Sequence, residues 1–134
     1  MNSVFIDTSF IVALVNEKDQ HHHRASELAE LFNEYPLVTT DAILLEVGNA
    51  LARNFKEQAV EVIDDFLTSD EVEIVHLDDL LFQKAFSLYR TRQDKAWGMI
   101  DCVSFVVMSE REIVDALTND KDFGQAGFHA LMRT

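Results

Sequence analysis

Short β-prone segments alternate with amphipathic helical segments along the chain, and this alternation restricts the folds open to it. Four segments are predicted strands and a fifth is a candidate edge strand, in the order Ser3–Ile6, Leu37–Thr39, Val72–Leu77, Ile113–Leu117 and Phe128–Leu131. Apolar residues at helical spacing predict helices between them, at Ser9–Asn16, His23–Tyr35, Phe55–Leu67, Leu80–Tyr89 and Ile100–Met108. A further helix carries the apolar positions from Ile43 to Leu51, and Thr40 or Asp41 can cap it. The alternation predicts a three-layer α/β/α sandwich with a mainly parallel central sheet. The length of 134 residues suits one domain, residues 1–134.

Four carboxylates interrupt segments that otherwise have the character of a hydrophobic core: Asp7, Glu46, Asp101 and Asp120. An ionised carboxylate is seldom buried without a partner or a metal. Asp7 and Asp120 follow predicted strands, at the sheet edge where α/β proteins bind ligands. Oxygen-rich sites suit Mg²⁺ or Mn²⁺, and two such ions can activate water and stabilise the leaving oxygen in phosphodiester hydrolysis. The pattern therefore indicates an acidic metal site.

Each acid also has a simpler explanation. Asp7 could cap the helix that follows it, and Asp101 could be a first-turn acid that complements the helix dipole. Taken singly, each acid fits the simpler explanation at least as well as the metal one. The metal hypothesis is favoured because all four acids stand at apolar boundaries and two of them stand at strand ends.

The net charge of −13 argues against strong nonspecific binding to nucleic acid. An enzyme acting on nucleic acid would need metal ions, a local basic patch or a second chain. Arg90, Arg92 and Lys95 form the densest basic cluster and are candidate RNA contacts, although cations at a helix C-terminus explain them equally well. For Arg53 and Lys56 the helix-terminus explanation is favoured.

Cysteine content and hydropathy bear on where the protein is found. Cys102 is the single cysteine, so no disulfide forms within the chain. Met1-Asn2-Ser3 lacks the charged start of a signal peptide, and no apolar stretch reaches membrane-spanning length. A cytoplasmic protein that does not contact a membrane is expected.

Four motifs carry a resemblance to a known family. They are Phe5-Ile6-Asp7-Thr8-Ser9, Leu45-Glu46-Val47-Gly48-Asn49-Ala50-Leu51, Asp94 with Trp97-Gly98-Met99-Ile100-Asp101-Cys102, and Leu117-Thr118-Asn119-Asp120-Lys121-Asp122-Phe123. In order and spacing they resemble the motifs of PIN-domain ribonucleases, and among these the VapC-like toxins of bacterial toxin–antitoxin pairs. Each motif is weak alone, but together they span nearly the whole chain.

The resemblance implies a metal-dependent endoribonuclease whose acidic quartet, Asp7, Glu46, Asp101 and Asp120, binds Mg²⁺ or Mn²⁺. Asp7 and Asp101 are the expected direct ligands, and Glu46 is expected to act through water. The resemblance also implies an RNA substrate, a VapB-like antitoxin that covers the site, and a homodimer. Secondary candidates are Asp122, which could replace Asp120, Asp94 as a further acid, and Thr8, Ser9 and Thr118, whose hydroxyls could orient carboxylates or contact phosphate.

Other features leave two interpretations open. Trp97 could stack on an RNA base or serve as a packing anchor. The apolar face of Phe55–Leu67 could serve a dimer interface or an antitoxin groove. His21-His22-His23 is interpreted as a polar turn rather than a zinc site, because consecutive side chains point in different directions.

Three other functions fit the sequence less well. A phosphotransfer receiver domain would need a better-placed lysine than Lys121, and a haloacid-dehalogenase-type phosphatase would need an acid where Ser9 stands. A catalytically inactive PIN-like binding scaffold is opposed by the presence of all four acids.

Overall fold

The computed structural model describes residues 1–134 and contains one five-stranded parallel sheet. The strands are β1 (Val4–Ile6), β2 (Leu37–Thr40), β3 (Val72–Val75), β4 (Asp115–Leu117) and β5 (His129–Ala130). Their order is β3-β2-β1-β4-β5, so β1 lies at the centre. Phe5 pairs with Val38 on one side and with Ala116 on the other. The C-terminal ends of β1 and β4 therefore meet at the same edge, as the sequence predicted for Asp7 and Asp120.

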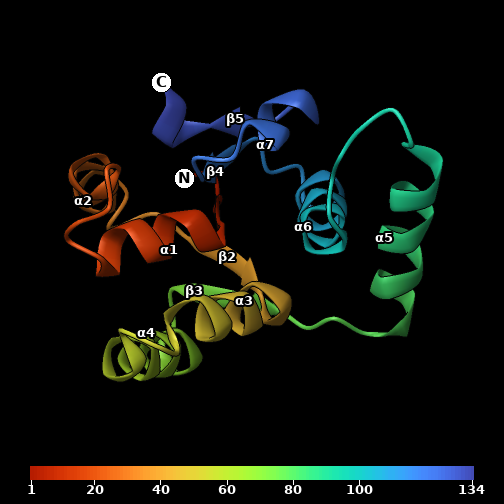
Figure 1. Cartoon of the computed structure of the whole chain (residues 1–134). Helices are drawn as coiled ribbons and strands as arrows, with labels where there is room; N and C mark the ends of the chain where they lie inside the picture. Colours follow the sequence, from red (N-terminus) through yellow and green to blue (C-terminus); the bar gives the residue numbers. More distant parts are fainter.

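Helices lie on both sides of this sheet (Figure 1). Around β1, helices α1 and α2 lie to the left in the view and α5 and α6 to the right. The helices are α1 (Thr8–Val15), α2 (His22–Leu31), α3 (Asp41–Leu51), α4 (Lys56–Thr68), α5 (Asp79–Thr91), α6 (Met99–Glu110) and α7 (Lys121–Gln125), and a 3₁₀ turn, η1 (Leu131–Arg133), ends the chain. The predicted α/β/α sandwich with a parallel sheet is confirmed. None of the helices is long and apolar enough to cross a bilayer.

Several predicted boundaries were wrong, and tertiary contacts explain one of them. The strand predicted to reach Leu77 ends at Val75, and the backbone N–H of Leu77 donates instead to the Asp41 carboxylate at 2.9 Å. The helix predicted to reach Tyr35 ends at Leu31. The last strand is shorter than predicted, because Leu131 already belongs to the 3₁₀ turn.

Helix α7 was not predicted, because five residues are too few to show a periodic pattern. It is nevertheless fixed to the core by Phe123, which is fully buried. The Phe123 ring lies 6.3 Å from the ring of Phe5 in β1 and 5.0 Å from that of Phe105 in α6. These contacts hold the start of α7 beside the end of β1.

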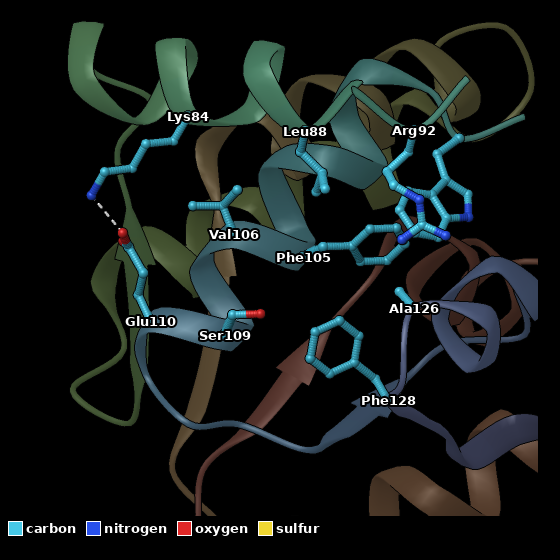
Figure 2. A pocket seen from close by; sticks show the side chains of 10 residues that line it. Lys84, Leu88, Arg92, Phe105, Val106, Ser109, Glu110, Ala126 and Phe128 are labelled. Carbon is cyan, nitrogen blue, oxygen red and sulfur yellow. Dashed lines mark hydrogen bonds and ion pairs between the residues drawn. The ribbon is translucent and has the colours of Figure 1, made fainter. Parts of the chain in front are cut away.

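Phe105 is the centre of an aromatic cluster that also includes Trp97 and Phe128. Its ring centroid lies 5.0 Å from Trp97, edge to face, and 5.7 Å from Phe128. Figure 2 shows Phe105 and Phe128 in the same pocket, below Leu88 of α5. Trp97 is only 6% exposed, so the structure favours the packing-anchor interpretation over stacking on RNA. The cluster fixes the chain just before α6, where Asp101 lies.

Candidate metal-binding active site

A polar cleft of about 470 Å³ opens at the C-terminal ends of β1 and β4. The four acids singled out in the sequence all line it: Asp7, Glu46, Asp101 and Asp120. Thr8 and Ser9 also line it, and so do Val12, Asp19, Gln20, His21 and Asn119. The fold therefore brings the predicted quartet to one place.

Asp7 is the most deeply buried member of the quartet, at 6% exposed. The hydroxyls of Thr118 and Ser9 both donate to its Oδ2, at 2.7 and 3.1 Å. Burial raises the pKa of Asp7, the charge of Glu46 adds to this effect, and the hydroxyl donors partly offset it. Its side chain makes no capping bond to α1, whereas Thr40 caps α3 through the N–H of Ile43. Asp7 is thus held for contact with the cleft rather than for capping.

Asp101 lies in the first turn of α6, where its Oδ2 accepts the N–H of Gly98 at 3.1 Å. The capping contact expected of a first-turn acid is therefore present, and the same side chain also lines the cleft. Burial, helped by the negative charges of Asp120, Asp7 and Asp122 and opposed by the bond from Gly98, raises the pKa of Asp101 to about 6. A bound cation would relieve this repulsion.

Asp101, Asp120 and Asp122 can each offer one oxygen so that all three oxygens lie within 4.8 Å of one another. Asp120 also caps α7, because its Oδ1 accepts the N–H of Asp122 at 2.9 Å. Burial and the charge of Asp120 raise the pKa of Asp122, which Lys121 and Lys95 partly offset. Asp120 and Asp122 thus both stand beside Asp101. This set of hard carboxylate oxygens fits a divalent cation such as Mg²⁺ or Mn²⁺.

Glu46 enters the cleft from α3 and is half-buried. The hydroxyl of Thr8, the first residue of α1, donates to its Oε1. Hydroxyls therefore orient both acids on this side of the cleft, Thr8 for Glu46 and the pair of Ser9 and Thr118 for Asp7.

Asp94 does not join the cluster. It is exposed and pairs with the Arg92 guanidinium, whose Nε and NH2 groups donate at 3.0 and 3.2 Å. This interaction lowers the pKa of Asp94 below its usual value, opposite to the change at Asp101. The structure gives Asp94 the role of a partner for Arg92.

Two lining residues, His21 and Asn119, were not assigned a role from the sequence. The amide nitrogen of Asn119 donates to Nε2 of His21 at 2.8 Å, and the N–H of Asn119 donates to the Ser9 hydroxyl at 2.9 Å. These contacts join the loop after β4 to the turn before α2 and to the start of α1. Asn119 stands inside a recognised motif, but nothing local in the sequence shows that it faces a histidine 98 positions away.

The PIN domain family model matches residues 4–129, and the chain belongs to the PIN domain family. Two curated relatives are each named 23S rRNA-specific endonuclease VapC20, from Mycobacterium tuberculosis strains CDC 1551 / Oshkosh and H37Rv. Each is 30% identical over 126 residues, covering 93% of this chain and 95% of the relative. The crystal structure of M. tuberculosis VapC20, described as a sarcin–ricin loop cleaving toxin, superimposes with a TM-score of 0.84 at 29% identity, covering 93% of this chain and 95% of that chain. The resemblance stated from the four motifs is confirmed.

Proposed function

We propose that residues 1–134 form a single metal-dependent endoribonuclease domain that acts as the toxin of a toxin–antitoxin pair. The observation that carries this proposal is the gathering of Asp7, Glu46, Asp101 and Asp120 in one cleft of a PIN fold. The similarity to VapC20 over nearly the whole of both chains supports the same activity. The raised pKa values of Asp7 and Asp101 support the metal-dependent part of the proposal, because carboxylates that are desolvated and repel one another favour a bound cation.

In this proposal Asp7, Asp101 and Asp120 would hold Mg²⁺ or Mn²⁺. Asp122, which lies beside Asp101, is a further candidate ligand. The bound ion supplies a Lewis acid that polarises the phosphodiester and lowers the pKa of water. Thr118 and Ser9 keep Asp7 in one orientation. Glu46, oriented by Thr8, is placed to accept a proton from the attacking water.

The substrate class is RNA. The names of the relatives make 23S rRNA, and its sarcin–ricin loop in particular, the first RNA to test.

A VapB-like antitoxin is the proposed protein partner, and an apolar groove supports it. Leu14 of α1, Ala29 of α2, Phe32 just after α2, and Val62 and Phe66 of α4 are among the residues that line a groove of about 280 Å³. From the sequence, the apolar face of Phe55–Leu67 was open to two interpretations, a dimer interface or an antitoxin groove. An apolar groove of this kind suits an amphipathic segment from a partner.

A homodimer is also proposed. Leu80 and Phe82, in the first turn of α5, are 61% and 50% exposed, which leaves apolar surface for a second copy. A mass measured by multi-angle light scattering tests this, and a strictly monomeric mass would contradict it. The free, buried Cys102 suits a reducing compartment, and the cytoplasm is the proposed location.

The central experiment compares RNA cleavage by the native chain with cleavage by Asp7→Asn and Asp101→Asn. Both variants should lose cleavage at least about a hundredfold while keeping a cooperative thermal transition, because each substitution removes a charged ligand but little volume. Asp94→Asn is the matched control and should cleave like the native chain, because Asp94 lies outside the acid cluster. Cleavage that survives in both site variants would refute the assignment. A native chain that binds RNA but cleaves none with Mg²⁺ or Mn²⁺ would support the inactive scaffold instead.

A further inference from the structure

A second cavity, of about 590 Å³, lies at the C-terminal end of α5 and in the loop that follows it. Phe86, Tyr89 and Arg90 line it from the helix, and Arg92 and Lys95 line it from the helix end and the loop. The chain has only 11 lysines and arginines against 24 acids, yet three of them gather here. Such a local excess of positive charge is unusual on a molecule with a net charge of −13.

The three cations are not equivalent. Arg92 pairs with Asp94 and lies over the Trp97 ring, 4.9 Å from its centroid, so it is occupied within the protein. Arg90 and Lys95 take part in none of the ion pairs of the structure. Arg90 lies 5.5 Å from the centroid of the Phe86 ring. Two cations therefore remain available to an anion.

Two aromatic rings are exposed beside these cations. Phe86 is 45% and Tyr89 is 46% exposed, and both line the cavity. They are three residues apart in α5, so they share one face of the helix. Exposed aromatic rings next to cations are the combination that binds an unpaired nucleotide, with stacking for the base and charge for the phosphate.

This cavity adjoins the catalytic cleft through the segment before α6. Gly98 lines the cavity, and its N–H donates to the carboxylate of Asp101 at 3.1 Å. Lys95 is also close enough to the acids that its charge acts on the pKa of Asp122. An RNA strand lying in the cleft would therefore pass within reach of this surface.

We infer that Phe86, Tyr89, Arg90 and Lys95 form a nucleotide subsite for the RNA substrate. It holds an unpaired nucleotide that flanks the cleaved phosphodiester, with the base stacked on Tyr89 and Phe86 and a phosphate bound by Arg90 and Lys95. The inference rests on the proposed ribonuclease function. The subsite would hold the RNA, a polyanion, at one place on a protein whose net negative charge repels RNA elsewhere. Bases within a duplex are not available for such stacking, so the subsite selects loops or single strands.

Binding is measured in the non-cleaving Asp7→Asn background with a fluorescent RNA hairpin that carries the sarcin–ricin loop, by anisotropy. Arg90→Ala with Lys95→Ala should raise the Kd roughly tenfold and lower the slope of log Kd against log salt by about 0.7 for each lost phosphate contact. Arg53→Ala with Lys56→Ala removes the same charge from exposed residues that do not line this cavity, and it should change the Kd less than about twofold.

The aromatic part is tested separately. Tyr89→Ala should raise the Kd roughly fivefold or more, while Tyr89→Phe, which keeps the ring, should bind like the parent. Equal Kd values for the two basic double variants, or equal losses in both Tyr89 variants, would overturn the inference. Unchanged RNA binding together with weaker antitoxin binding would also overturn it, and would assign the surface to the protein partner.

Cleavage kinetics separate this inference from the proposed function. With Asp7 intact, the variants at Arg90, Lys95 and Tyr89 should raise KM and leave kcat nearly unchanged, because they remove binding away from the reacting atoms. If the native chain cleaves RNA and the subsite variants keep the native KM, only the subsite is wrong. If the native chain cleaves no RNA, the proposed function itself fails.

Discussion

Asp7 and Asp101 both have raised pKa values, but their surroundings differ. Asp7 is almost fully buried and depends on two hydroxyl donors, Thr118 and Ser9. Asp101 is only partly buried, and its pKa is raised both by desolvation and by the charges of three neighbouring acids. The proposed ligand Asp7 is therefore held in one orientation by its hydroxyl donors, whereas the pKa of Asp101 responds to the charges of three neighbouring acids.

This difference predicts how pH acts on the metal-free protein. The pKa of Asp101 is about 6 in the folded state and near 3.8 in the unfolded chain. As the pH rises, the unfolded chain therefore loses the Asp101 proton at a lower pH than the folded protein does. The free energy of unfolding consequently falls between about pH 4 and pH 6. Thermal melts in chelator should show Asp101→Asn more stable than the native chain at pH 7.5, with a smaller difference at pH 5.

The affinity for Mn²⁺ should change with pH in the opposite sense to this stability. It should fall as the pH drops through 6, since protons compete for the ligands. Calorimetric titrations that gave the same Mn²⁺ affinity at pH 7.5 and pH 5 would contradict this expectation. Thermal melts in which the native chain and Asp101→Asn had the same pH dependence would contradict the predicted effect on stability.

At the scale of elements, the site depends on how α6 and α7 are fixed to the sheet. Both helices begin at an acid-bearing turn, and both are anchored through the ring of Phe105, which contacts Trp97 before α6 and Phe123 in α7. The short α7 has too few residues to be stable alone. Its position beside Asp101 comes from aromatic packing rather than from helix propensity.

Phe105→Ala should therefore lower both stability and cleavage. Loss of a fully buried phenylalanine costs about 3–5 kcal/mol, measurable by urea unfolding, and the residual folded protein should bind Mn²⁺ more weakly because Asp101 and Asp120 lose their alignment. Val114→Ala is the control. Val114, just before β4, is 61% exposed, so its loss should cost less than about 1 kcal/mol and leave Mn²⁺ affinity unchanged. A stable Phe105→Ala variant with native Mn²⁺ affinity would show that this cluster does not position the site.

At the scale of the whole molecule, three surfaces with different chemistry have distinct positions. The acidic cleft lies at the ends of β1 and β4, the basic and aromatic cavity lies at the end of α5, and the apolar groove lies among α1, α2 and α4. Charged, polar and aromatic side chains thus face the proposed RNA, while the apolar groove is left for a protein. Residues that bind the antitoxin can therefore differ from those that cleave RNA.

Phe66→Ser should separate these two activities. It removes an apolar side chain from the groove, and it should weaken binding of the cognate antitoxin about tenfold or more while RNA cleavage by the free protein persists. Val60→Ser, on the same helix but exposed and outside the groove, is the matched control. Calorimetric titration with the antitoxin measures both, and equal affinities for the two variants would place the antitoxin elsewhere.

The amino-acid sequence by itself determined the fold class and the identity of the four acids. Hydrophobic periodicity is a local property, so the strand–helix alternation was visible, and with it the strand ends that carry Asp7 and Asp120. The boundaries were less predictable, because contacts such as that between Leu77 and Asp41 join residues distant in the chain.

Only the tertiary structure decided which residues stand together in and around the cleft. It placed Asp122 beside Asp101 and left Asp94 outside, paired with Arg92. It joined Thr118 to Asp7 across 111 positions and Asn119 to His21 across 98. The physical reason is that hydrogen bonds and charge repulsion depend on distance in space, and the parallel sheet, not the order of residues, sets those distances.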